Sequence, residues 1–417
     1  MRKALLFMPD AIALESTTIK MKTSAALASM LSATALIAQT NAPAPALEAA
    51  PKIQFKPYGW IKFDAVSDSA RTSYGDIAFF VMPSSAPGGG ESETTFSARD
   101  LRLGTHIIAP LQDGIAVRGR VEGDLCDDLA PNAYKPRLRL AFADIDLGDG
   151  WLVTAGQAWD TYCAIFPETL DPSNLGHAGN PYGRHPLARV TKNSALGGSS
   201  TLALKLAVQS GRNAADYDAD GQSDENASGA PSFHASAVLQ TKLLTDEPAL
   251  FAISGAFGKE KLNGAAPADD GAGGIDSAEY DSALLHFAAK LPLTERLAIQ
   301  GVVFTGENLD NYLAGIAQGV NVAAGKEVST TGGYINVIFK ATPKLALSAG
   351  YGIDDPDDND LAPAGARVKN DRAFANAAYK LTGQLSIWGE YSHMETTYAG
   401  GATERNDRVH LSAKYAF

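Results

Sequence analysis

The sequence of 417 residues lacks several features that would place it in a common soluble class. It contains two cysteines, too few for a disulfide scaffold. Basic residues are scarce, since 35 Lys and Arg face 47 Asp and Glu, and the net charge of −12 argues against a nucleic-acid partner. No Gly-x-Ser-x-Gly, His-Glu-x-x-His or phosphate-loop motif occurs. We therefore expect neither an enzyme nor a required cofactor.

The N-terminal region predicts export. Lys22 follows Met21, an apolar run extends from Ala25 to Ala38, and small residues come next, which is the order of a secretory signal peptide. We assign residues 1–42 to this signal region, with the true start at Met21 and cleavage between Ala38 and Ala42. Residues 43–52 form a Pro/Ala-rich periplasmic lead-in that cannot continue a helix. Beyond it no run reaches the roughly 18 apolar residues of a membrane helix.

From residue 53 to 417, helical periodicity is scarce and apolar residues alternate with polar ones, which predicts an all-β domain. The alternation divides this region into sixteen candidate strands: 53–66, 95–109, 114–126, 135–147, 151–159, 184–195, 200–211, 232–243, 249–260, 278–291, 295–306, 329–341, 344–354, 370–381, 384–396 and 405–417.

The connections between these strands alternate between long and short. Short ones such as "GDG", "PLTE", "TP" and "TG" follow long ones such as 160–183 and 307–328. Short periplasmic turns, long external loops and an even strand number are typical of an antiparallel barrel in the outer membrane of a Gram-negative bacterium. The alternative is a secreted, soluble all-β binding or adhesion protein, which has no reason to keep its long loops on every second connection.

One face of each candidate strand is apolar. In the last strand, Val409, Leu411, Ala413, Tyr415 and Phe417 alternate with polar residues up to the end of the sequence. Sixteen strands enclose a lumen too wide for side chains to fill, so the polar row should face water inside and the apolar row should face lipid. The closing strand should then pair with the first, because a bilayer requires every backbone amide to be satisfied.

The lumen-facing row of several neighbouring strands is basic. Arg137 and Arg139, for example, alternate with Leu138 and Leu140, which we expect to face lipid. Such a basic stripe attracts anions and can hold carboxylates by bidentate hydrogen bonds. The alternative is an ordinary porin ladder whose arginines pair with loop carboxylates, which would leave only a weak preference for anions. If the residues that alternate with the apolar row face the lumen, the basic residues that line the pore are Lys62, Arg102, His106, Arg118, Arg120, Arg137, Arg139 and Arg189.

The loop over residues 160–183 is unusually apolar, since it carries Ile165, Phe166, Leu170 and Leu175. We expect this loop to fold into the lumen and narrow it, because a wide barrel needs a constriction. Two of its carboxylates, Glu168 and Asp171, would then face the arginine wall and create a strong local field. The alternative is an external loop that packs on a neighbouring subunit.

The segment "DYDADGQSDE" (216–225) has the spacing of a calcium loop. Gly221 permits the tight turn, but Ala227 occupies the twelfth position, where a bidentate glutamate is usual. A solvated acidic loop is the alternative. The candidate Ca²⁺ ligands are Asp216, Asp218, Asp220, Gln222 and Asp224.

The two cysteines fall on the outer side of the predicted barrel. Cys126 ends one strand and Cys163 lies in the loop 160–183. A disulfide between them would suit an oxidising compartment and would fasten the loop to the wall.

Several motifs resemble those of the DcaP-like trimeric porins of Gram-negative bacteria. They are "YGWIKFDAV", "SARDLRLGTHIIAPL", "VRGRVEGDL", "WLVTAGQAWDTY" with "FPETLD", and the terminal Phe. The resemblance implies a sixteen-stranded homotrimer that admits dicarboxylates and similar organic anions through an arginine-rich constriction. It also implies that Arg102, Arg118, Arg120, Arg137 and Arg139 line the pore. A helical coiled coil often precedes the barrel in that family, whereas here a Pro/Ala stretch does.

The predicted barrel and this resemblance together lead us to expect a passive diffusion channel for small solutes.

Overall fold

The computed structural model describes residues 52–110, 115–127, 134–210, 225–227, 231–263, 277–363 and 365–417. The predicted signal region and nearly all of the Pro/Ala-rich stretch lie outside the described residues. So do the candidate calcium ligands Asp216, Asp218, Asp220, Gln222 and Asp224, and these predictions stay untested. No helix in the described part of the chain is long and apolar enough to cross a membrane.

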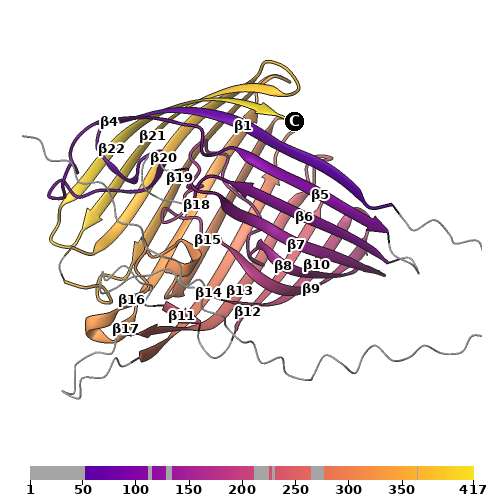
Figure 1. Cartoon of the computed structure of the whole chain (residues 1–417), viewed down its shortest axis with the longest axis horizontal. Helices are drawn as coiled ribbons and strands as arrows, with labels where there is room; N and C mark the ends of the chain where they lie inside the picture. Colours follow the sequence, from indigo (N-terminus) through magenta and orange to yellow (C-terminus); the bar gives the residue numbers. More distant parts are fainter. Residues whose placement is uncertain are drawn as a thin grey trace, which may run out of the picture. The chain divides into compact units, whose positions relative to one another are not determined.

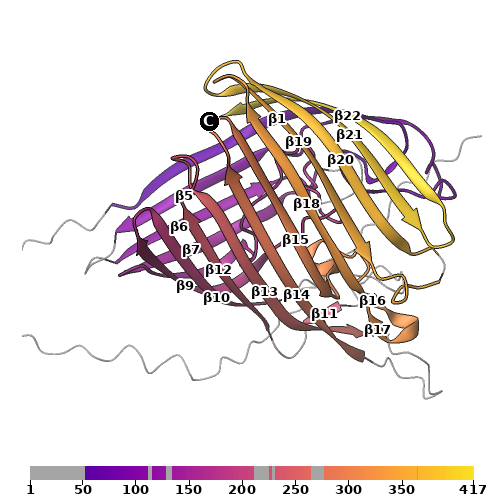
Figure 2. The ribbon, with the colours of Figure 1, turned by 180° about the vertical axis from the view of Figure 1, so that it is seen from behind.

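The described chain is one large antiparallel sheet that closes on itself (Figures 1 and 2). The first strand pairs with the last on one side and with the second wall strand on the other. The predicted sixteen-stranded barrel is confirmed. Its strands are β1 (Gln54–Asp68), β4 (Glu93–Ser97) and β5 (Arg102–Pro110) as two halves of one strand, β6 (Ala116–Asp124), β7 (Arg137–Gly148), β8 (Trp151–Trp159), β9 (Arg184–Gly197), β10 (Ser200–Gln209), β12 (Ser232–Thr241), β13 (Ala249–Asn263), β14 (Ser277–Pro292), β15 (Leu297–Glu307), β18 (Ser329–Lys340), β19 (Leu345–Pro356), β20 (Arg367–Lys380), β21 (Leu385–Tyr398) and β22 (Thr403–Ala416).

Short elements occupy the long connections. The hairpin β2 (Thr72–Tyr74) and β3 (Ile77–Val81) lies between β1 and β4. The three-residue β11 (Glu225–Ala227) pairs with β13. Between β15 and β18 lie η2 (Asp310–Tyr312), β16 (Val320–Asn321), η3 (Val322–Ala324) and β17 (Lys326–Glu327).

The two faces of the wall differ as the alternation predicts. On the closing strand β22, Leu411 is 55% exposed and Phe417, just after it, is 48% exposed, whereas His410 and Ser412 are buried inside. The outer face carries exposed Leu, Ile, Val, Phe and Tyr on strand after strand, which is the surface that lipid requires. Indigo β1 and yellow β22 run side by side where the barrel closes (Figure 1).

One predicted strand is broken into β4 and β5 at residues 98–101. β4 pairs with β1 up to Asp64 and β5 begins opposite Trp60, so four residues of this strand stand opposite three of β1. This bulge directs Arg99 inward, where it is fully buried and its guanidinium binds the Asp76 carboxylate. A strict period of two cannot represent such an extra residue.

A second bulge changes which side chains of β7 face the lumen. Glu122 pairs with Leu140 while the next residue, Gly123, pairs with Leu138, so Arg139 is the extra residue. Leu140 is completely buried, whereas Leu138 is 52% exposed. The expectation that Leu140 faces lipid is therefore wrong, because the bulge turns the rest of the strand by one face.

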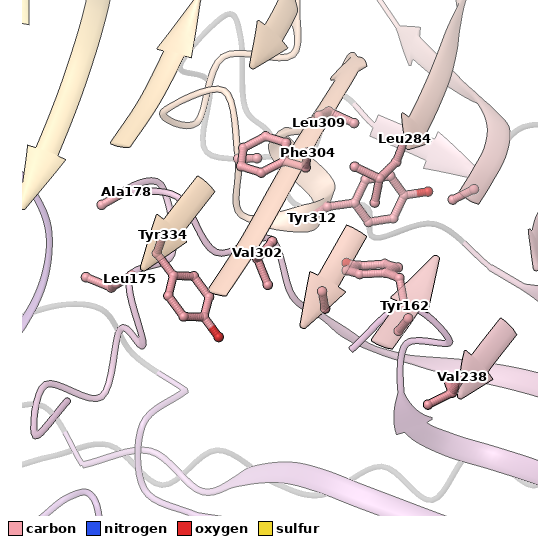
Figure 3. Close-up of a cluster of buried hydrophobic side chains, with 14 of the residues drawn as sticks. Tyr162, Leu175, Ala178, Val238, Leu284, Val302, Phe304, Leu309, Tyr312 and Tyr334 are labelled. Atoms are coloured by element: carbon pink, nitrogen blue, oxygen red, sulfur yellow. The ribbon is translucent and has the colours of Figure 1, made fainter. Parts of the chain in front are cut away.

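The apolar core lies inside the barrel, between the wall and the inward loops. Figure 3 shows Leu175 and Ala178 of the loop 160–183 near Tyr334 of β18, and Tyr162 near Tyr312 of η2. A second apolar cluster joins β3 to the loop that follows η2 through Phe79, Phe80 and Ile316, together with Ile77 and Cys126. Three long loops thus fill part of the lumen that the wall alone would leave open.

Candidate constriction site

The loop 160–183 lies inside the barrel, as predicted, and wall side chains satisfy its backbone. The amide of Gln300 donates to the Phe166 carbonyl (2.7 Å), and that of Asn376 donates to the Glu168 carbonyl (2.7 Å). The Glu168 N–H in turn donates to Asn336 Oδ1 (3.0 Å). A loop inside a barrel needs such partners because buried backbone groups without hydrogen bonds are costly. Polar residues on β15, β18 and β20 therefore fix the path of the loop.

The loop approaches the wall so closely that glycine is required on both sides. Gly179 has φ +107°, and a Cβ built on it would lie 2.1 Å from the Gly333 carbonyl oxygen. A Cβ on Gly352 of β19 would lie 2.1 Å from the Ala178 carbonyl oxygen. Any side chain at these positions would push the loop into the pore.

Asp171 holds the loop to the opposite wall. It lines the same cavity as Arg102, Arg137 and Arg139, but its ion pairs are with other arginines. Its carboxylate instead accepts from Arg408 Nη1 (2.6 Å) on β22 and lies 3.0 Å from Arg372 Nη1 on β20. Asp68 binds the other face of the Arg408 guanidinium through two hydrogen bonds (2.8 and 2.9 Å). Burial alone would raise the pKa of Asp171, but the two guanidinium groups hold that pKa below its usual range.

Glu122 of β6 is the centre of the arginine wall. Its carboxylate accepts from Arg102 (3.1 Å), Arg120 (2.7 Å) and Arg139 (2.9 Å), as well as from the Tyr58 hydroxyl (2.7 Å). Three guanidinium groups thus share one carboxylate. The lumen-facing arginines come from β5, β6 and β7, as the alternation predicts.

A second carboxylate supports the outer part of the same wall. Asp124 accepts two hydrogen bonds from Arg137 (2.9 and 2.8 Å) and one from Arg139 (2.8 Å). On β1, Lys62 donates to Asp100 (2.8 Å) and lies 3.3 Å from Asp64. The basic residues of the wall are therefore fixed in position by carboxylates that come mostly from neighbouring strands and from the bulge at residues 98–101.

A cavity of about 360 Å³ lies between this wall and the loop. Glu168 is exposed at its edge, so this predicted carboxylate does face the arginine side. Aromatic rings support the cations: Arg102 lies 4.3 Å from the centre of the Trp60 ring and Lys414 lies 5.2 Å from that of Trp388. The lining includes Lys62, Arg102, Arg137, Arg139, Lys414, Asp100, Glu168 and Asp171.

Four predicted pore residues, namely Arg120, Arg118, His106 and Arg189, do not line this cavity. Arg118 is exposed on β6 and stands opposite Asp144 of β7. His106 stacks on Tyr58 with ring centres 4.6 Å apart. Arg189 donates from Nη1 to the Trp159 carbonyl (3.1 Å). The constriction thus gathers Lys62, Arg102, Arg137 and Arg139 around the cavity, and Glu122 joins the more exposed Arg120 to this group.

The predicted disulfide is wrong, because Cys126 and Cys163 are both free. Cys126 is buried against Ile77 and Phe79, and its Sγ donates to the Arg99 carbonyl (3.3 Å). Cys163 packs against a different apolar cluster, around Tyr162. The two thiols therefore belong to separate packing units. Within the described residues, no group of three or more His, Cys, Asp or Glu side chains is placed to hold a metal ion.

No protein-family model and no curated protein matches the sequence. The structure is similar to that of the outer membrane channel DcaP of Acinetobacter baumannii, with a TM-score of 0.71 and 19% identity over 88% of this chain and 97% of that one. The chain has the porin fold. The resemblance inferred from its motifs is thus confirmed for the fold.

Two further porins align over a similar length. An anion-selective porin from Comamonas acidovorans gives a TM-score of 0.56 at 12% identity, over 88% of this chain and all (100%) of that one. OprB of Pseudomonas putida gives 0.55 at 9% identity, over 87% of this chain and 94% of that one. These structural neighbours are outer-membrane porins and channels.

Proposed function

We propose that this protein is an outer-membrane porin through which small solutes diffuse passively, with a preference for organic anions such as dicarboxylates. One observation carries the preference. The side chains of Arg120, Arg137 and Arg102 are 33%, 25% and 13% exposed, whereas those of their carboxylate partners, Glu122 and Asp124, are at most 1% exposed. Guanidinium groups therefore form the lumen surface, and the neutralising carboxylates lie behind them.

Selectivity in such a pore comes from field and size together. A solute that enters the cavity of about 360 Å³ meets guanidinium donors within a confined space, where charges act more strongly than in bulk water. Planar carboxylates match these donors by bidentate hydrogen bonding. Because the arginines are bound to wall carboxylates, they keep their positions while the solute passes. The channel needs no cofactor, performs no chemistry and is not an enzyme in this proposal.

The setting of the channel belongs to the same proposal. The apolar outer face supports a barrel embedded in lipid of a Gram-negative outer membrane, after export by a signal in residues 1–42. A soluble binding or adhesion protein would not benefit from exposing Leu411, Tyr415 and Phe417 on one continuous face. The resemblance to trimeric porins supports a homotrimer.

Planar-bilayer recording tests the proposal. Purified protein should give stepwise conductance increases, and a KCl gradient should give a reversal potential displaced toward the chloride equilibrium value. Heat-denatured protein is the control and should give no steps. Absence of steps from folded protein would overturn the channel, and a potassium-directed reversal potential would overturn the anion preference alone.

A further inference from the structure

A second cavity, of about 150 Å³, adjoins the constriction on the side of the long loops. Tyr74 of β2, Phe79 of β3 and Tyr182 of the loop 160–183 contribute to its lining. It shares Arg137, Arg139 and Trp159 with the larger cavity. The two cavities are therefore neighbours in the lumen, with these shared residues between them. We call the cavity of about 360 Å³ the inner cavity and that of about 150 Å³ the outer cavity.

Of the three arginines that line the outer cavity, Arg184 is absent from the lining of the inner cavity. It lies at the start of β9, and its guanidinium carbon is 4.9 Å from the centre of the Trp159 ring. Unlike Arg137 and Arg139, it has no carboxylate within ion-pair distance among the described residues. Its Nη1 is buried without a hydrogen-bond partner in that part of the chain. A buried guanidinium nitrogen of this kind is costly unless a ligand or water pairs with it.

Lys414 of β22 is the comparable residue in the inner cavity, because it too is a cation that contacts indole rings. Its Nζ lies 5.4 Å from the Trp60 ring centre and 5.2 Å from that of Trp388. Lys62 and Arg102, which line the same cavity, both contact Asp100, whereas Lys414 has no carboxylate partner among the described residues. Each cavity thus contains one cation supported by indole rings instead of by an anion.

We propose that Arg184 forms an outer binding station for the carboxylate group of a small organic anion, which then passes over Arg137 and Arg139 to Lys414. Stacking on Trp159 orients the guanidinium while leaving its N–H edge free for a planar, bidentate acceptor. Chloride offers one acceptor atom to the two parallel N–H groups, whereas a carboxylate offers two, so the station favours carboxylates over a simple anion. This assignment deepens the proposed porin function and rests on it.

The size of the outer cavity sets the class of ligand. About 150 Å³ accommodates a carboxylate and a short carbon stem, and a second carboxylate could extend toward the shared arginines. A dicarboxylate would therefore bind the next arginine with one carboxylate before the other carboxylate leaves Arg184, so that the two carboxylates are never both returned to water. This stepwise exchange requires each station to bind weakly enough for release.

Arg184→Lys and Arg184→Gln separate recognition from charge. Channels in planar bilayers carry chloride current, and succinate is added at rising concentration until half of the current is blocked. Arg184→Lys should leave the chloride reversal potential unchanged but raise the half-blocking succinate concentration about tenfold, as expected for loss of one hydrogen bond to a charged group. Arg184→Gln should raise it at least as much.

Lys414→Gln and Arg296→Gln complete the series. Lys414→Gln should also weaken the succinate block, whereas Arg296→Gln, in an exposed turn between β14 and β15, should match wild type. A wild-type half-blocking concentration in both Arg184 variants would overturn the outer station, and one in Lys414→Gln would overturn the inner one. Anion-selective conductance of the wild type would leave the porin function intact in either case, whereas a non-conducting wild type would overturn that function itself.

Discussion

Asp171 of the constriction loop accepts a 2.6 Å hydrogen bond from Arg408 of β22, although 237 positions separate the two residues. Both side chains are buried, and Asp68, Arg372 and Glu390 extend the pair to an alternating network of three carboxylates and two guanidinium groups. The network joins the loop to the strand that closes the barrel. The position of the constriction is therefore linked to the closure of the wall.

Replacing Asp171 by Asn should release this end of the loop. The change removes one of the two carboxylates that each guanidinium group binds, since Arg408 keeps Asp68 and Arg372 keeps Glu390, so it should cost up to about 3–5 kcal/mol. We expect a larger and noisier single-channel conductance and a lower urea midpoint for loss of the heat-modifiable band on gels. Asp246→Asn, which removes an exposed carboxylate paired with Lys242, is the control and should alter neither. Wild-type conductance in Asp171→Asn would show that the loop is held by its other contacts.

Acid should open the channel only well below pH 4. The folded-state pKa of Asp171 is lowered, so its ion pairs stabilise the loop at every pH above the ordinary aspartate pKa of about 3.9. That stabilisation is lost as the pH falls through the lowered pKa. Conductance measured from pH 7 down to pH 2 should stay flat to about 4 and rise only at the acid end. Asp171→Asn should show no such rise, and a wild-type transition near pH 5 would assign the effect to another group.

Arg120→Glu should move the channel toward cations. Arg120 Nη2 lies 2.7 Å from Glu122, and a third of its side chain is exposed to the lumen. The substitution replaces a lumen cation with an anion beside an existing carboxylate, so the local field changes sign. The reversal potential in a KCl gradient should shift toward the potassium equilibrium value. Arg296→Glu makes the same charge change in a turn and should have little effect. An unchanged potential in Arg120→Glu would remove this residue from the conduction path.

The two thiols should titrate as free. Because burial, reinforced by the nearby Asp124, raises the pKa of Cys126 to about 12, its thiolate is scarce at neutral pH. Folded protein should react slowly with a maleimide at pH 7, and unfolded protein should take up two equivalents without a reductant. Gel mobility should be the same with and without reductant. A reductant-dependent shift would restore the disulfide that the structure lacks.

The alternation of the sequence by itself determined the barrel. Period-two rows such as His410 and Ser412 against Val409 and Leu411 fix which face meets water, because a one-residue slip would invert every side chain. The same rows predict Lys62, Arg102 and Arg139 on the lumen side, and all three line the cavity of about 360 Å³. The apolar residues of the loop 160–183 also required burial, and the inward fold follows from that requirement.

Only the tertiary structure decided how the charges are paired and where the alternation fails. At the bulges at residues 98–101 and at Arg139, the side chains that follow switch from one face of the sheet to the other. A bulge depends on how a strand pairs with its neighbour, and the alternation within one strand does not contain that information. Asp171 meets Arg408 because the barrel closes, and among the described residues Arg184 has no carboxylate partner because aromatic and apolar side chains of the inward loops line its cavity. A sequence states which residues are charged, but the distance to a counter-charge is a property of the folded chain.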